Sequence, residues 1–177
     1  MKILRELCGW LVYIVIIVAI TFLINTFVGQ RTHVKGSSME PHLSEGDNLI
    51  VDKISYRFRD PERYEIVVFP YQFESNTFYI KRIIGLPGER VQIIGGFIYI
   101  DGERLHEDYG LAVMESAGLA ADPIQLMRDE YFVLGDNRNH SSDSRDPSVG
   151  VLNRSDLLGR AWLRIWPLNQ FGVIPHE

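Results

Sequence analysis

Two side chains in this sequence have the types needed for a nucleophile and its base. Ser38 lies between Gly36, which permits close backbone approach, and Pro41, which fixes the exit of the chain. A serine hydroxyl is a weak nucleophile unless a neighbouring base removes its proton. Lys81 can act as that base if burial disfavours its charged form. Taken alone, Ser38 is also compatible with an ordinary serine in a turn, and Lys81 with an ordinary lysine on the surface.

The setting of Lys81 favours burial, because Arg82 follows it directly in the strand-like run 78–84. Side chains alternate along a strand, so the two cations point to opposite faces. Both cannot point outward, and one must be covered. A useful base near neutral pH needs its pKa lowered by about 3 units from about 10.4, which corresponds to roughly 4 kcal/mol.

A third segment, 135–145, is dense in turn-forming residues. Asp136 and Asn137 suit an Asx-type turn. Asp143 and Arg145 can form a charge-assisted pair that fixes a loop. The alternative is a surface loop with a weak ion pair.

Short strands must position these three segments. Gly95-Gly96 predicts a two-residue hairpin turn, and Asp101-Gly102 predicts a second turn. Segment 106–129 lacks a clear period and is interpreted as a loop or insertion with one short helix. The fold class is therefore mainly β, a compact sandwich or partly closed barrel. The predicted strands are β-branched or aromatic runs at 48–53, 65–69, 78–84, 90–94, 97–100, 130–134 and 159–165.

An apolar segment precedes the β-rich part and predicts an N-terminal transmembrane helix at 7–28. Its 22 residues span about 33 Å at ~1.5 Å per residue, enough for a bilayer core. The segment is longer than the apolar core of a cleavable signal peptide, and no A-x-A-like site follows it. The flanking positive charges are nearly balanced, so the positive-inside rule does not decide its orientation.

Composition excludes several other classes of function. The 177 residues carry a net charge of −5 and no basic stripe, which argues against a nucleic-acid partner. The only cysteine is Cys8, so neither an intramolecular disulfide nor a zinc site built from cysteines can form. No metal and no cofactor is expected.

Together, and in this order, the segments resemble type I signal peptidases, also called leader peptidases, of the short, single-anchor bacterial type. Four motifs carry the resemblance. They are S-M-x-P at 38–41, G-D-x-V-x-V-x-K at 46–53 with Leu49 for the first valine, K-R-x-x-G-x-P-G-D at 81–89 with Glu89 for the aspartate, and G-D-N-x-x-x-S-x-D-S-R at 135–145.

The resemblance implies roles for individual residues. Ser38 attacks the scissile carbonyl, and its backbone N–H stabilises the oxyanion. Lys81, in its neutral form, takes the proton of Ser38 and passes it to the leaving amine. Ser141 hydrogen-bonds and orients Lys81. The residues implied to support the site structurally are Gly135, Asp136, Asn137, Asp143 and Arg145.

The family cuts secretory preproteins after small residues at positions −1 and −3. Shallow apolar pockets enforce that choice, although core packing is an equally good interpretation of each candidate residue. The implied pocket residues are Val34, Met39, Leu43, Tyr79 and Ile80.

Two positions depart from the family pattern. Some members carry a serine as second oxyanion donor where this chain has Gly36, which leaves a backbone N–H, a water or Ser37 as candidates. His42 replaces a usual threonine and raises the idea of a Ser–His pair. A residue four positions along a turn rarely points back at the nucleophile, so that pair is disfavoured.

The resemblance implies a membrane-bound serine endopeptidase that removes signal peptides from secreted preproteins. It predicts a cytoplasmic tail at 1–6, the anchor at 7–28 and an extracytoplasmic catalytic domain at 29–177 of a single-pass cell-membrane protein. Secretory preproteins and the lipid bilayer are the expected partners. The alternatives are a self-cleaving Ser-Lys peptidase and a membrane-tethered, non-catalytic β module for protein binding.

Overall fold

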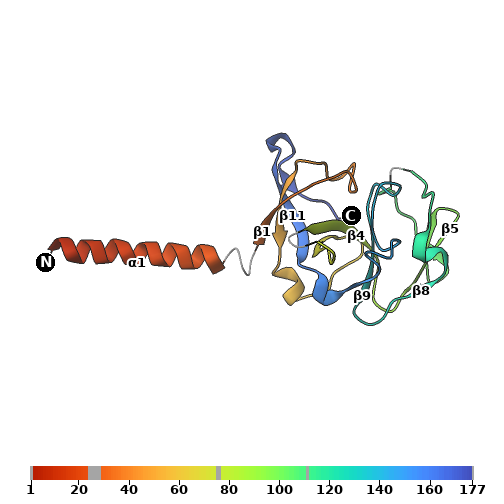
Figure 1. The fold of residues 1–177 in the computed structure, drawn as a ribbon, viewed down its shortest axis with the longest axis horizontal. Helices are drawn as coiled ribbons and strands as arrows, with labels where there is room; N and C mark the ends of the chain where they lie inside the picture. Colours follow the sequence, from red (N-terminus) through yellow and green to blue (C-terminus); the bar gives the residue numbers. More distant parts are fainter. Residues whose placement is uncertain (1, 24–28, 75–76, 111, 177) are drawn as a thin grey trace.

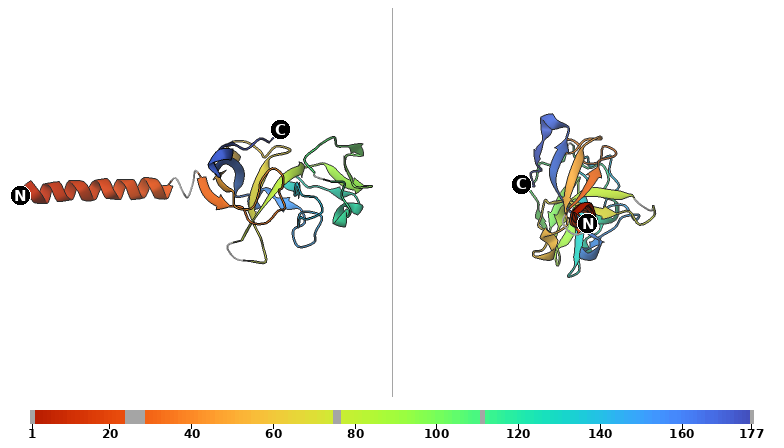
Figure 2. Two further views of the ribbon diagram at one scale, coloured as in Figure 1. Left: turned by 90° about the horizontal axis from the view of Figure 1, so that it is seen from above. Right: turned by 90° about the vertical axis from the view of Figure 1, so that its left-hand side faces the viewer.

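The computed structural model consists of one helix and a β-strand domain, and it describes residues 2–23, 29–74, 77–110 and 112–176. Helix α1, Lys2–Leu23, extends away from the β domain, as Figures 1 and 2 show. Residues 24–28 of the predicted anchor lie outside the described residues. Within the described ranges, no helix reaches the combined length and apolar character of a membrane span.

The domain is mainly β, and its strands pair antiparallel in two sheets. The larger sheet runs in the order β1-β2-β11-β3-β4-β9-β10, with β12 on β11. Its strands are β1 Gly29–His33, β2 Asn48–Asp52, β3 Ile66–Pro70, β4 Phe78–Gly85, β9 Glu130–Leu134, β10 Leu152–Asn153, β11 Gly159–Trp166 and β12 Gly172–Val173. In the described chain, β1 and β10 are edges, so this sheet is not a fully closed barrel.

The smaller sheet lies on the side of the domain farthest from α1 (Figure 1) and runs in the order β7-β6-β5-β8. Its strands are β5 Arg90–Ile94, β6 Phe97–Ile100, β7 Glu103–Arg104 and β8 Ile124–Gln125. In the described part of the chain, 3-10 turns link the strands at η2 Ser55–Arg57, η3 Gly118–Ala121, η4 Arg154–Asp156 and η5 Leu168–Gln170.

All seven predicted strands are confirmed within one or two residues at their ends. The predicted hairpin turn between β5 and β6 is also confirmed, since Gly95 and Gly96 have φ of 57° and 82°. Such positive φ values suit glycine and match the twist of paired strands. The pattern did not predict β1, because its sequence GQRTH lacks an apolar alternation.

Segment 106–129 contains η3 and β8 between irregular stretches. It is packed rather than loose. Met114, Ala120 and Leu126 are buried in the core cluster beneath the smaller sheet.

Strand β4 is the structural centre of the domain. It pairs with β3 on one side and β9 on the other, and every residue from Ile80 to Gly85 is buried. Successive side chains enter different cores: Ile80 packs in one apolar cluster, Ile83 in a second and Ile84 in a third. Both faces of this strand are therefore covered, and a charged residue on either face is removed from water.

Candidate active site

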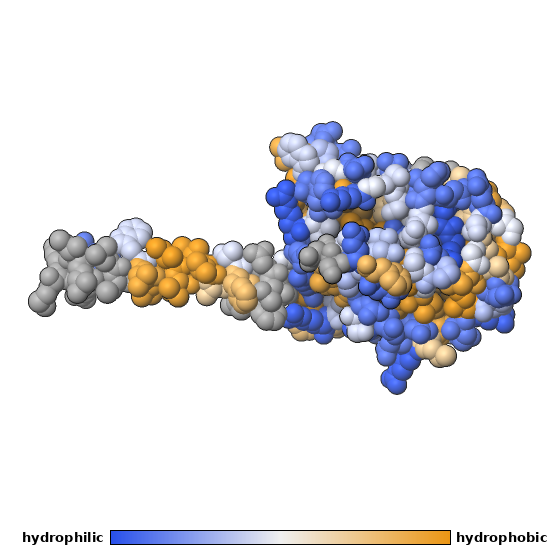
Figure 3. All heavy atoms as spheres, in the orientation of Figure 1, coloured by the Kyte–Doolittle hydropathy of each residue, from blue (hydrophilic) through white to orange (hydrophobic). Residues whose placement is uncertain are grey.

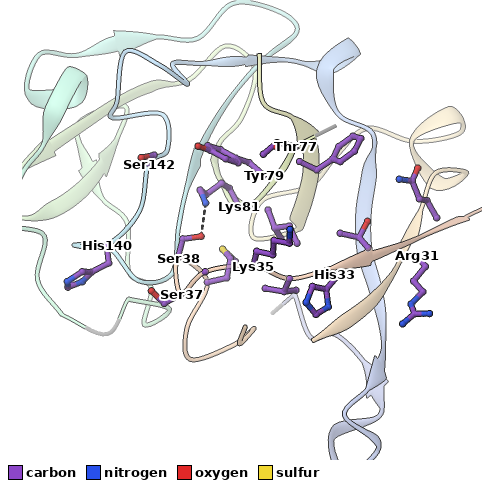
Figure 4. Close-up of a pocket in the computed structure, with 17 residues that line it drawn as sticks. Arg31, His33, Lys35, Ser37, Ser38, Thr77, Tyr79, Lys81, His140 and Ser142 are labelled. Carbon is purple, nitrogen blue, oxygen red and sulfur yellow. Dashed lines mark hydrogen bonds between the residues drawn. The ribbon is translucent and has the colours of Figure 1, made fainter. Parts of the chain in front are cut away.

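The nucleophile and base candidates meet beside the middle of β4. Lys81 Nζ donates a hydrogen bond to Ser38 Oγ at 2.8 Å (Figure 4). Lys81 is 3% exposed, and Ser38 is half-buried. Both side chains line a cavity of about 500 Å³. The turn after β1 and the strand β4 thus bring together two residues that are 43 positions apart.

A tight turn presents Ser38 to this cavity. Gly36 has φ of +79°, a left-handed conformation that glycine adopts without strain. The turn then closes on itself, with Glu40 N–H donating to Ser37 O and Leu43 N–H donating to Met39 O. The serine is held by backbone bonds on both sides.

The loop 135–145 fixes the turn from the other side. The backbone N–H of Asn137 donates to Ser38 O at 3.0 Å, and its side-chain Nδ2 donates to Ser37 O at 3.2 Å. Gly135 has to lack a side chain, because a Cβ there would lie 2.6 Å from Ser38 O and 2.2 Å from Ser141 Oγ. The close approach of these two loops sets the position of the serine.

Burial changes the acidity of Lys81. The pKa of its ammonium group is lowered to about 8, chiefly because the group is removed from water, and the Arg145 guanidinium acts in the same direction. The carboxylates of Asp143 and Asp136 act in the opposite direction but do not cancel the effect. Among the described residues, no carboxylate forms an ion pair with Lys81 within 4.0 Å. A substantial fraction of this amine is therefore neutral near pH 8.

The neighbouring cation, Arg82, is also buried, so the structure covers both cations where alternation required only that one be covered. Arg82 is 0% exposed and donates to both carboxylate oxygens of Asp136, at 2.8 and 2.7 Å. It also donates to Tyr64 O at 2.9 Å, and its Cζ lies 3.8 Å from the ring centre of Tyr109. A fully paired guanidinium can be buried on the second face of the strand.

Asp143 and Arg145 form the ion pair that the sequence suggested. Asp143 accepts from Arg145 Nε and Nη2, both at 2.8 Å, and from the backbone N–H of Gly135 at 3.0 Å. Arg145 also donates to Ser116 O and Arg138 O. The pair is buried and ties the loop 135–145 to the segment before η3.

Ser141 does not take the place that the resemblance implies. Its Oγ atom is buried and has no hydrogen-bond partner among the described residues, so it does not hydrogen-bond Lys81. The hydroxyl instead packs against the Cα of Gly135. Ser142, and not Ser141, lines the Ser38–Lys81 cavity (Figure 4). The sequence offered one signal for Ser142 as a cavity residue, which is its position next to the motif residue Ser141.

Four of the five predicted pocket residues line the cavity, and Leu43 does not. Leu43 is 0% exposed and belongs to the apolar core, because the turn directs it inward. The four that line the cavity are Val34, Met39, Tyr79 and Ile80.

The cavity also has lining residues that the sequence reasoning missed. They come from β1, from the start of β4 and the residue before it, and from the loop 135–145, and they include Arg31, His33, Thr77, Phe78 and His140. Their pattern carried no signal, although Phe78 lies only three positions before Lys81. Among the described residues, no group of three or more His, Cys, Asp or Glu side chains is suited to a metal ion.

Comparisons with known proteins identify the family of this chain. The family described as "Signal peptidase, peptidase S26" matches residues 7–166. Probable signal peptidase I-2 of Synechocystis sp. is 43% identical over 87% of this chain and 71% of its own length. Signal peptidase I P of Bacillus subtilis subsp. natto is 35% identical over 93% and 92%.

A crystal structure of a signal peptidase I from Enterococcus faecalis V583 is also similar, with 31% identity, a TM-score of 0.48 and coverage of 58% of this chain and 97% of that one. The family match spans most of the sequence, and the curated relatives are aligned over most of their own lengths. The chain therefore belongs to the type I signal peptidases of peptidase family S26.

Proposed function

We propose that this chain is a membrane-anchored serine endopeptidase that removes signal peptides from secreted preproteins with Ser38 as nucleophile and Lys81 as general base. The observation that carries the proposal is the 2.8 Å contact between Lys81 Nζ and Ser38 Oγ in a site where the amine has no carboxylate partner within ion-pair distance among the described residues. Geometry and the lowered pKa of Lys81 point to the same role.

The proposed reaction proceeds in two halves. Neutral Lys81 takes the proton of Ser38 as Oγ bonds to the scissile carbonyl carbon. The resulting ammonium group gives its proton to the leaving amine as the C–N bond breaks, and an ester between substrate and Ser38 remains. Lys81 then removes a proton from water, which attacks the ester. Return of that proton to Ser38 Oγ releases the signal peptide and restores the enzyme.

The oxyanion of each tetrahedral intermediate needs preorganised donors. Among the described residues, no acceptor is hydrogen-bonded to the backbone N–H of Ser38, which makes this group a suitable donor. One such donor is worth about 3 kcal/mol in the transition state. Gly36 offers no side chain as a second donor, so Ser37 or a backbone N–H nearby is the candidate.

Selection of small residues fits the lining of the cavity. Val34, Met39 and Ile80 are nearly fully buried, so their exposed surface forms shallow apolar walls rather than deep pockets. A large side chain at position −1 would have to displace core residues, which is costly in a close-packed interior.

Helix α1 is the proposed membrane anchor. Its described apolar side chains between Trp10 and Phe22 are exposed, and Figure 3 colours much of this stretch as hydrophobic. So much apolar surface on a helix apart from the domain is unfavourable in water and favourable in lipid. Signal peptides emerge on the far side of the membrane, so the catalytic domain belongs on the extracytoplasmic side. A shared membrane also raises the effective concentration of substrate.

The test uses the full chain in detergent micelles and a preprotein with an A-x-A cleavage site. Ser38→Ala and Lys81→Ala should each abolish cleavage, while melting followed by tryptophan fluorescence shows a folded domain. Ser155→Ala, an exposed serine on η4, is the matched control and should cleave as the parent does. Cleavage by the Ser38 or Lys81 variant at the parental rate would refute the dyad.

A further inference from the structure

His42 follows the nucleophile by four residues, yet it does not line the Ser38–Lys81 cavity. Its Nδ1 atom lies 3.0 Å from Oδ2 of Asp136, which is 0% exposed. The contact is close but not linear, so Nδ1 has no regular hydrogen bond in this geometry. A small rotation of the ring would align an N–H with the carboxylate.

This contact closes a ring of neighbouring residues around the site. Asp136 holds Arg82 through two hydrogen bonds, and Arg82 is the direct neighbour of Lys81 on β4. Lys81 in turn contacts Ser38, which begins the turn that ends at His42. The segment carrying the nucleophile and the strand carrying the base are thus joined twice, once at the reactive atoms and once through His42 and Asp136.

The surroundings hold the imidazole in this place. The ring of Tyr109 lies 5.7 Å from that of His42 and also stacks beneath the guanidinium of Arg82. Arg164, on β11, donates to the backbone carbonyl of His42. Since the side chain of His42 is only 32% exposed, its freedom to leave Asp136 is restricted.

We propose that His42 is a positioning residue, which aligns Ser38 with Lys81 by linking the nucleophile turn to the Arg82–Asp136 pair. Charge compensation alone does not explain the contact, because Arg82 already neutralises Asp136. The inference rests on the proposed Ser38–Lys81 dyad and deepens it.

The link also has an electrostatic consequence. Asp136 is one of the two carboxylates that raise the pKa of Lys81 against the effect of burial. An N–H of His42 that points at Asp136 partly offsets the negative charge of that carboxylate, so Asp136 raises the pKa of Lys81 less. Among the described residues, the charged or titratable groups that contact His42 or its partner Asp136 are Asp136 from the loop 135–145, Arg82 from β4, Arg164 from β11 and Tyr109 from segment 106–129. Loss of the imidazole should therefore move the acid limb of the pH–rate profile upward.

Two amide variants separate positioning from packing. The Nδ2 of an asparagine falls near the place of Nδ1, whereas a glutamine amide extends to the place of Nε2. His42→Asn should keep kcat for cleavage of an A-x-A preprotein within about twofold of the parent. His42→Gln and His42→Leu should lower kcat by about tenfold at unchanged KM, because misaligned reacting groups lose rate rather than affinity. The acid limb of His42→Leu should also shift by a few tenths of a pH unit.

The control is His106→Leu, an exposed histidine outside the Ser38–Lys81 cavity, which should match the parent. Equal loss in the asparagine, glutamine and leucine variants, with unshifted profiles, would reduce His42 to a packing residue. Full activity in all three would overturn the inference as well. Either result leaves the dyad standing if Ser38→Ala is inactive, so failure of the inference is distinct from failure of the proposed function. If the leucine variant does not fold, the asparagine and glutamine pair decides.

Discussion

The two faces of β4 bury a cation each, and they do so by different means. On one face, Arg82 is surrounded by acceptors and is bidentate with Asp136. On the other, the hydrogen-bond partner of Lys81 Nζ among the described residues is the uncharged hydroxyl of Ser38, and Nζ lies 5.1 Å from the ring centre of Tyr79. Burial is nearly equal, at 0% and 3% exposure.

The difference shows that the presence of a carboxylate partner decides whether a buried basic side chain stays protonated. A guanidinium stays protonated and must be paired, so Arg82 serves as a fixed charge. An ammonium group without a carboxylate can lose its proton instead, and the pKa of Lys81 falls to about 8. One strand therefore holds a structural charge and a reactive amine at adjacent positions.

The largest expected effect on activity comes from placing an arginine on both faces of β4. Lys81→Arg places a permanently charged group beside Ser38, which removes the base while keeping a hydrogen-bond donor. Cleavage of an A-x-A preprotein should fall by about 10⁴-fold. Residual activity within about tenfold of the parent would mean that proton acceptance by residue 81 is not required.

The next effect is on folding. Arg82→Met leaves the Asp136 carboxylate buried without its guanidinium, and loss of one partner of a buried pair costs about 3–5 kcal/mol. The midpoint of thermal unfolding, followed by near-UV circular dichroism, should fall accordingly. An unchanged midpoint would show that Asp136 is compensated in another way, for instance by His42.

Replacement of Lys81 by an apolar residue should stabilise the fold, whereas replacement of Arg82 should destabilise it. The folded pKa of about 8 lies below the ordinary value of 10.5, so the unfolded chain binds more protons between these values and stability rises with pH across this window. Below pH 8 the full penalty applies, at about 3 kcal/mol. Lys81→Met should therefore raise the unfolding midpoint at pH 7, and the gain should vanish near pH 10.5. A destabilised variant at pH 7 would contradict this.

The smallest effect needs no substitution. Because the neutral amine is the reactive form, kcat/KM should rise with pH to a plateau above about 8. Between pH 8 and pH 7 it should fall by about fivefold. A flat profile over this interval would indicate either a much lower pKa in the enzyme or a rate-limiting step other than proton transfer.

The sequence predicted the strands well because their signal is local. The run 78–84 is β-branched and ends before Gly85, and it became β4 almost unchanged. β1 was missed, since its five residues are polar and belong to the sheet only through pairing with β2. A strand that is specified by its partner carries no pattern of its own.

At the site, the sequence identified the reactive residues but not their packing. Alternation correctly put Lys81 and Arg82 on opposite faces, but it could not reveal that β4 is covered on both sides. Leu43 was expected in the pocket and is in the core, and Ser141 packs against Gly135 instead of bonding Lys81. These positions depend on how loops meet, which no short motif encodes.

The residue at position 135 offers a practical criterion for judging whether a related sequence encodes an active protease. A chain could retain the serine and the lysine and still pass a simple motif search as an intact protease. If it carried alanine or anything larger at this position, the loop would be forced off the nucleophile turn by the overlap with Ser38 O. Such a chain should be sorted as an inactive relative unless its loop is rebuilt.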